Sequence, residues 1–193
     1  MVDIPSPKNL FFGNIEIPID LTIKGEVYIE KYDVRDNSLV ETREFSNMLT
    51  NGFLDKNLTE DSFSPLAWDN YGGNPDGYSL YGPLEYCAIG SDNTAPSRSD
   101  TGCKNQLAKD NGVNYSRSSK YNLPAWVQRK FTFEAGTGTG TVREVSAETS
   151  AFSASDYFCC ARQLVDPVIE KNDYHELIVY WKFYLDRGQN NWS

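Results

Sequence analysis

The sequence predicts a mainly β protein: an antiparallel β-sandwich of about seven strands with two short helical insertions, a long loop and an extended N-terminal arm. Three observations lead to this expectation. Aromatic residues make up 13% of the 193 residues, a share that favours strands. Several runs alternate apolar and polar residues with a period of two, which is typical of strands with one buried face. Turn-forming residues separate these runs at roughly even intervals, which is the spacing of a sandwich or barrel.

The N-terminal part is predicted to contain the arm and a first hairpin. Residues 1–23 include several prolines and show no clean alternation, so we expect an extended arm. Strands are expected over residues 24–33 and 39–45, and the turn residues at 35–38 would join them into a hairpin. Residues 52–58 are expected to form one or two helical turns.

A long loop is predicted over residues 59–83, which are rich in Gly, Pro, Asp, Asn, Ser and Tyr and repeat at neither strand nor helix period. Long loops in compact domains are often functional. Flat aromatic faces beside carboxylates and amides could bind a sugar, or they could pack on the domain or on a neighbouring subunit. An EF-hand frame fails here, which leaves an irregular calcium site as the open alternative. The candidate contacts to a partner or a glycan are Trp68, Tyr71, Tyr78 and Tyr81.

The second half of the chain alternates more plainly. A short helix is expected over residues 101–109, capped by Asp100 or Thr101. The glycine run at residues 136–140 is interpreted as a hairpin turn and not as a phosphate loop, because it lies between two strands and lacks a following Lys-Ser or Lys-Thr. Strands are predicted over residues 85–90, near Tyr115, and over residues 125–134, 141–148, 157–165 and 176–186.

The domain organisation follows from these elements and from the length, which suits one domain. We expect the arm at residues 1–23, one sandwich domain at residues 24–187 with the insertion at about 59–83, and a C-terminal tail at residues 188–193.

Composition argues against several classes of function. The net charge is -9 and the pI about 4.6, so we expect no nucleic-acid binding, which depends on Lys and Arg neutralising phosphates. The start of the chain resembles no export signal, and no window approaches the roughly 18 apolar residues of a membrane span, so we predict a soluble protein made in a cytoplasm without membrane insertion. The cysteines are expected to be small, semi-buried apolar residues: Cys87, Cys103, Cys159 and Cys160.

The residues that could carry chemistry favour a protein that is not an enzyme. His175 is the single histidine, it precedes the last predicted strand as part of a turn, and no G-x-S-x-G nucleophile elbow exists to pair with it. Carboxylate pairs such as Glu144 and Glu148 could be proposed for glycoside hydrolysis, but a chain with 27 acidic residues always offers such pairs. We therefore predict no catalytic residues, no metal site and no cofactor.

Five motifs follow one another in a fixed order between residues 24 and 186. A strand pair leads into an N-x-(L/V)-T-x-x-G-L-like step. Later steps resemble an hΦGxGxxxPxxxDTxL run, where Φ is apolar, an R-x-F-x-F…GxGxGxΦxEΦ hairpin, and two closing strands. The ordered series resembles virion proteins of tailed bacteriophages. The residues that carry the resemblance are 45–54, 87–96 with Asp100, Thr101 and Leu107, 129–145, 160–164 and 177–181.

The resemblance implies a β-sandwich without known catalytic residues, acting as a structural component of a phage tail. Such a subunit would form a ring or fibre-anchoring junction at a collar or baseplate, through contacts with copies of itself and with other tail proteins, and its location would be the virion. One alternative is a carbohydrate-binding module that recognises a host-surface glycan. A further alternative is a head-tail connector or a capsid decoration protein. The long loop and the proline-rich arm depart from the pattern, and leave the place in the particle open.

Overall fold

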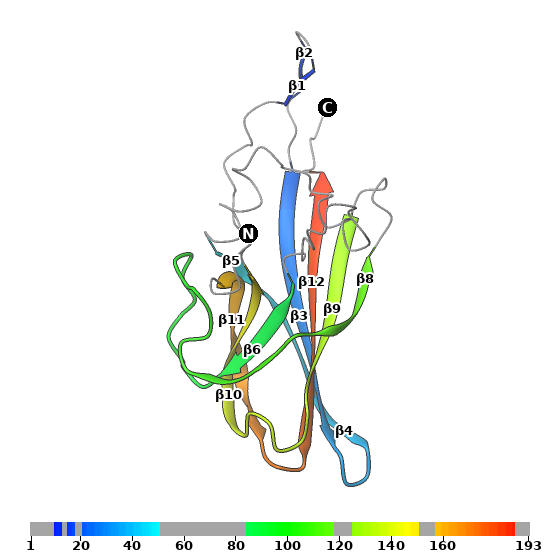
Figure 1. Cartoon of the computed structure of the whole chain (residues 1–193), viewed down its shortest axis with the longest axis vertical. Coiled ribbons are helices and arrows are strands. Elements are labelled where there is room, and N and C mark those ends of the chain that lie inside the picture. Colours follow the sequence, from blue (N-terminus) through cyan, green and yellow to red (C-terminus); the bar gives the residue numbers. More distant parts are fainter. Residues whose placement is uncertain are drawn as a thin grey trace.

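The computed structural model describes residues 10–12, 15–17, 21–50, 84–117, 125–150 and 157–187, and every regular element in these ranges is a β-strand (Figure 1). None of these residues belongs to a helix that could cross a membrane. The expected helical turns at 52–58, the long loop at 59–83 and the tail at 188–193 lie outside the described residues.

Ten of the strands form two five-stranded sheets in which all pairs are antiparallel, and β1 pairs with β2 separately. Sheet 1 has the order β4-β3-β12-β9-β8, and sheet 2 has the order β5-β11-β10-β6-β7. The strands are β1 (Leu10–Phe12), β2 (Ile15–Ile17), β3 (Leu21–Asp33), β4 (Ser38–Ser46), β5 (Met48–Leu49), β6 (Tyr86–Gly90), β7 (Gln106–Asp110), β8 (Val113–Arg117), β9 (Ala125–Phe133), β10 (Gly140–Ser150), β11 (Tyr157–Lys171) and β12 (His175–Arg187).

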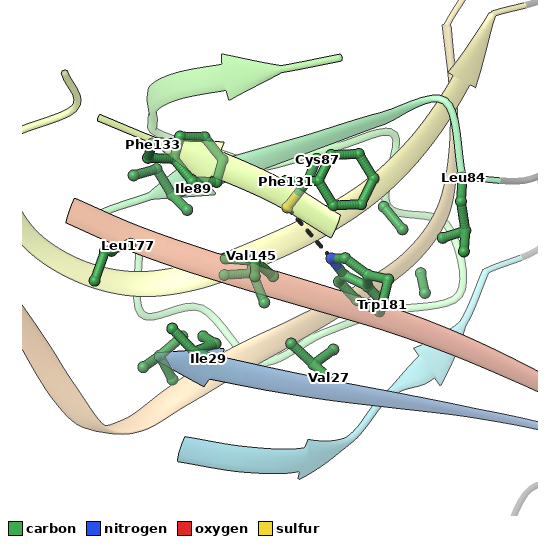
Figure 2. Packing of buried hydrophobic residues seen from close by; sticks show 14 of the residues in the cluster. Val27, Ile29, Leu84, Cys87, Ile89, Phe131, Phe133, Val145, Leu177 and Trp181 are labelled. Atoms are coloured by element: carbon green, nitrogen blue, oxygen red, sulfur yellow. Dashed lines mark hydrogen bonds between the residues drawn. The ribbon is translucent and has the colours of Figure 1, made fainter. Parts of the chain in front are cut away.

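The two sheets share one hydrophobic core, to which each contributes the apolar residues of its inner face. Trp181, in the central strand β12, is fully buried, and its Nε1 donates a hydrogen bond to Sγ of Cys87 on β6 at 3.3 Å (Figure 2). Burial of alternate residues along the strands is the period of two that the sequence shows. Labelled members of the core in Figure 2 are Val27, Ile29, Phe131, Phe133, Leu177, Leu84, Ile89 and Val145.

The mainly β class and the antiparallel sheets are confirmed, and the predicted strands correspond to β3, β4, β6, β8, β9, β10, β11 and β12. The turn expected at 35–38 joins β3 to β4, and the glycine run joins β9 to β10, where Gly136 and Gly138 have positive φ of 80° and 64°. β3 begins at Leu21, so its first three residues lie in the segment that the sequence assigned to the arm.

The helix predicted over residues 101–109 is wrong. The segment contains strand β7, which pairs with β6, and Leu107 and Ala108 pack against the core. The backbone N–H groups of Lys104 and Asn105, which would bond within a helix, are donated to the buried carboxylate of Glu144 at 3.2 and 3.0 Å. A tertiary partner thus overrides the local helix signal, which is a weak determinant of structure.

Arg129 interrupts the apolar face of β9, and the structure gives the reason. Its guanidinium donates to three backbone carbonyls: Leu84 at 2.8 Å, Gly112 at 2.9 Å and Asn111 at 3.3 Å. These carbonyls belong to the segments that precede β6 and follow β7. The side chain that breaks the pattern therefore fastens both segments to sheet 1.

Strand β4 is an edge of sheet 1 and carries two features that discourage another strand from pairing with it. The register with β3 shifts at Val40, which is an extra residue between the pairs Lys31↔Glu41 and Tyr32↔Leu39. Glu41 of β4 forms an ion pair with Lys31 of the neighbouring strand β3, which is only 6% exposed. A bulge and a charge on the inner side together make this edge irregular.

The cysteines are free thiols, and Cys87, Cys159 and Cys160 are buried while Cys103 is half-buried, in agreement with the prediction. The pKa of each thiol lies above its ordinary value, mainly because the thiol is buried. Because the thiolate is the reactive form, we expect the native chain to react with dithiobis(nitrobenzoate) far more slowly than a free cysteine does. Absorbance at the product band should show a slow native reaction and, in urea, rapid titration of all 4 thiols. A burst of one or more thiols in the folded protein would contradict this expectation.

Candidate functional site

The aromatic residues that the sequence singled out, Trp68, Tyr71, Tyr78 and Tyr81, lie outside the described residues, so their role as partner or glycan contacts stays a prediction. His175 opens strand β12, and its Nδ1 accepts the backbone N–H of Asn172 at 3.3 Å. Two other groups of polar side chains stand out in the described ranges. One is buried on sheet 2, and the other lines a groove on sheet 1.

The buried group is centred on Arg162 of β11, whose side chain is fully inaccessible to solvent. Its Nε donates to Glu144 at 2.7 Å and its Nη1 donates to Asp100 at 3.0 Å. Its Nη2 lies 3.6 Å from Asp92. Burial alone would lower the pKa of Arg162. The hydrogen bonds to Glu144 and Asp100 and the charges of these carboxylates outweigh burial, so the pKa lies above its ordinary value. Arg162 is thus the cation that allows several carboxylates to sit beneath the surface.

The connection from β6 to β7, residues 91–105, is held on sheet 2 by this group. Besides Arg162, Glu144 accepts backbone N–H groups of Asp92 at 3.3 Å, Lys104 at 3.2 Å and Asn105 at 3.0 Å. A Cβ added at Gly90 would collide with the Glu144 carboxylate, so only glycine fits there. The buried charges therefore have a structural role, because these contacts clamp the connection onto the sheet.

The carboxylates Glu144 and Glu148, which the sequence offered as a possible acid pair, have separate partners. Glu148 accepts a hydrogen bond from Ser146 at 2.7 Å and forms an ion pair with Lys109 at 2.5 Å. Glu144 is occupied by Arg162 and by the backbone of the connection. Within the described ranges, no three His, Cys, Asp or Glu side chains are grouped so that they could hold a metal ion.

The second group lines an open groove of about 340 Å³ on the outer face of sheet 1. All its lining residues come from four neighbouring strands, and the face is the one opposite the core. Tyr28 lies across from Tyr180 on one side and from Glu44 on the other in the register of β12, β3 and β4. The rings of Tyr28 and Tyr180 have centroids 6.0 Å apart at an interplanar angle of 37°. The groove is lined by Glu26, Val27, Tyr28, Glu30, Glu44, Gln128, Tyr180, Lys182 and Tyr184.

Tyrosine hydroxyls orient the carboxylates of the groove. Tyr184 donates to Oε2 of Glu26 at 2.6 Å, and Tyr180 donates to Oε2 of Glu30 at 3.4 Å. Partial burial raises the pKa of Tyr180 and of Tyr184, and the adjacent carboxylate raises each further. The phenols therefore keep their protons and act as donors. In each case the Oε1 oxygen accepts no hydrogen bond from the described part of the chain.

Lys182 is the cation among the residues that line the groove, and Lys130 and Lys24 lie on the same sheet face, opposite Tyr180 and Tyr184. The Nζ of Lys182 lies 4.6 Å from the ring centroid of Trp126 and 4.6 Å from that of Tyr184, within the range of cation–π attraction. The ammonium is thus seated between two aromatic rings at one end of the groove.

The sequence contained a signal for this groove that the loop-centred interpretation missed. Polar and aromatic residues alternate on the face opposite the apolar residues, at Glu26, Tyr28 and Glu30 in β3 and at Tyr180, Lys182 and Tyr184 in β12. Their identity was visible, but the register that sets Tyr28 against Tyr180 depends on strand pairing over a separation of about 150 residues and could not be obtained from alternation alone.

Comparison with known proteins found no family model, no curated protein and no solved structure that matches this chain.

Proposed function

We propose that this protein is a structural subunit of a bacteriophage tail, a β-sandwich that joins neighbouring proteins in a ring or fibre-anchoring junction. The observation that carries the proposal is the groove on the outer face of sheet 1, where tyrosines and carboxylates are presented on a rigid five-stranded sheet. Tyrosine is enriched at protein interfaces because its ring offers contact area with few rotatable bonds. The order of motifs that resembles phage virion proteins supports the same assignment.

The scaffold suits such a role in a second way. In Figure 1 the β3–β4 hairpin lies at one end of the two-layered body. Exposed apolar side chains near that hairpin include Val34, Leu39 and Val40, with Tyr174 from the adjoining turn. Apolar groups gathered on a surface favour contact with another protein. The subunit thus offers two contact surfaces, one on the outer face of sheet 1 and one at the β3–β4 hairpin.

Assembly is the measurable consequence. We expect light scattering to give a mass above the 21.8 kDa of one chain, either for the purified protein alone or for its mixture with the products of adjacent tail genes. Deletion of residues 1–20, which leaves strand β3 whole, should keep the fold by circular dichroism and reduce assembly, because the arm is expected to lie on a neighbour. A monomer in every mixture would sink the proposal, and normal assembly of the truncated chain would remove the arm from it.

A carbohydrate-binding module is the second candidate. The tilted pair Tyr28 and Tyr180 beside Gln128 and Glu44 offers the flat faces and polar groups that sugars contact. On this alternative, cell-wall or capsule glycans should change the tyrosine and tryptophan fluorescence in a saturable way. Fluorescence that does not change as glycan is added would exclude the carbohydrate-binding function.

A further inference from the structure

We propose that the groove of sheet 1 receives a lysine or arginine side chain presented by a partner protein. This inference rests on the proposed function and names the chemistry of the contact. Among the residues that line the groove, the charged side chains are Glu26, Glu30 and Glu44 against the single cation Lys182. The lining is therefore negative, within a chain whose net charge is -9. Charge complementarity of this kind selects a basic partner and repels an acidic one.

The carboxylates are prepared to accept hydrogen bonds from an incoming cation. Hydroxyl groups of Tyr184 and Tyr180 hold Oε2 of Glu26 and Glu30, which fixes the orientation of both carboxylates. The Oε1 oxygens accept nothing from the described residues. Hydrogen bonds between an ionised donor and a carboxylate are about twice as strong as neutral ones. An ammonium or guanidinium group is thus a better occupant than a neutral hydroxyl.

The tyrosine rings provide the second part of the recognition. Tyr28 is 36% exposed and lies beside Tyr180 between the carboxylates of the groove. The face of an aromatic ring carries negative potential and attracts a cation within about 6 Å of its centroid. The combination of ring faces and carboxylates therefore favours a cation over a sugar, which needs no negative charge.

The same sheet face already seats a cation in this manner. Lys182 places its ammonium 4.6 Å from the rings of both Trp126 and Tyr184. In the register of β3 and β12, Lys182 lies opposite Glu26, one row from Tyr28 opposite Tyr180. The volume of about 340 Å³ stands at the lower end of the roughly 300–1,000 Å³ of ligand pockets, which suits a single long side chain.

The test is a titration of the full-length, ¹⁵N-labelled chain with N-acetylated, C-amidated pentalysine, followed by amide chemical shifts. We expect saturable shifts confined to residues 26–30, 44, 128 and 180–184, with weaker binding as salt is raised. A pentaglutamate peptide should leave these signals in place. A neutral oligosaccharide should do the same.

Variants separate the carboxylates from the rings. Glu26→Gln and Glu30→Gln should each weaken pentalysine binding about two- to fivefold, the range of a partly exposed ion pair. Tyr28→Leu should weaken it by a similar factor of about two to five, whereas Tyr28→Phe keeps the ring and should keep the affinity. Asp173→Asn is the matched control, since it removes one negative charge from the exposed turn before β12, outside the groove.

Several results would overturn the inference. These are the absence of saturable shifts, shifts spread over the whole acidic surface, an Asp173→Asn variant that loses as much affinity as Glu30→Gln, or shifts in the groove with the oligosaccharide in place of pentalysine. Light scattering distinguishes this from failure of the proposed function: a chain that assembles with a tail protein but ignores pentalysine refutes the cation pocket alone. A chain that binds pentalysine in the groove but never assembles refutes the subunit role alone.

Discussion

Replacing Arg162 with methionine is expected to destabilise the protein by about 3–5 kcal/mol, the usual result of breaking a buried ion pair by removing one partner. The variant keeps a long side chain but leaves Glu144 and Asp100, which are 0% and 5% exposed, without their shared cation. That loss is a large part of the roughly 5–15 kcal/mol that stabilises a typical domain. Urea unfolding followed by circular dichroism measures it.

Controls separate the buried cation from charge in general. Arg98→Met removes an exposed arginine from the same connection and should change stability by no more than about 0.5 kcal/mol. Adding Glu144→Gln to Arg162→Met should recover part of the loss, because it also removes a buried negative charge. Trypsin should cut after Arg98 faster in the single variant, since the connection is no longer clamped. An Arg162→Met protein as stable as the parent would refute the clamp.

Trp181→Ala is expected to cost about 3–5 kcal/mol, the range for a large buried aromatic residue replaced by alanine. Trp181 is fully buried in β12, between β3 and β9, and faces β6 of the other sheet through its hydrogen bond to Cys87 (Figure 2). The substitution would leave a cavity between the two layers. Urea unfolding followed by circular dichroism gives the value without depending on tryptophan fluorescence.

Two companion variants test the origin of this effect. Trp181→Phe fills most of the space and loses the N–H donor and part of the ring volume, so its cost should be clearly smaller than that of Trp181→Ala. Tyr174→Ala removes an aromatic ring that is 51% exposed and should cost much less than Trp181→Ala. Equal losses for Trp181→Ala and Tyr174→Ala would mean that burial between the sheets does not determine the contribution of this tryptophan.

The sequence predicted most of the fold because one physical signal, alternation with a period of two, recurs along the strands. Val27 and Ile29 in β3 and Leu177, Val179, Trp181 and Phe183 in β12 show it plainly, and all of them are buried in the core. The prediction failed at residues 101–109, where the backbone N–H groups find Glu144 instead of a helical partner. Local propensity carries no information about a carboxylate that lies about 40 residues further along the chain.

The two polar groups were hidden for different reasons. In β10 and β11, Glu144 and Arg162 occupy the face that alternation assigns to solvent, so their burial becomes visible only when the connection at 91–105 is placed over them. In the groove, Tyr28 and Tyr180 come from strands that are distant in sequence, and their pairing depends on register. The identity of these side chains can be read from the sequence, but which of them lie next to one another is known only from the folded structure.

The bulge at Val40 and the inward-facing Glu41, which pairs with Lys31 of β3, affect how the edge strand β4 behaves before the protein meets its neighbours. An exposed edge strand without such irregularities can pair with the same strand of another copy through backbone hydrogen bonds alone, and repeated pairing of this kind forms fibrous aggregates. For the proposed tail subunit, an edge strand that does not pair with other copies through its backbone would allow the protein to reach a high concentration during infection without aggregating. Assembly would then depend on side-chain contacts with the correct partner.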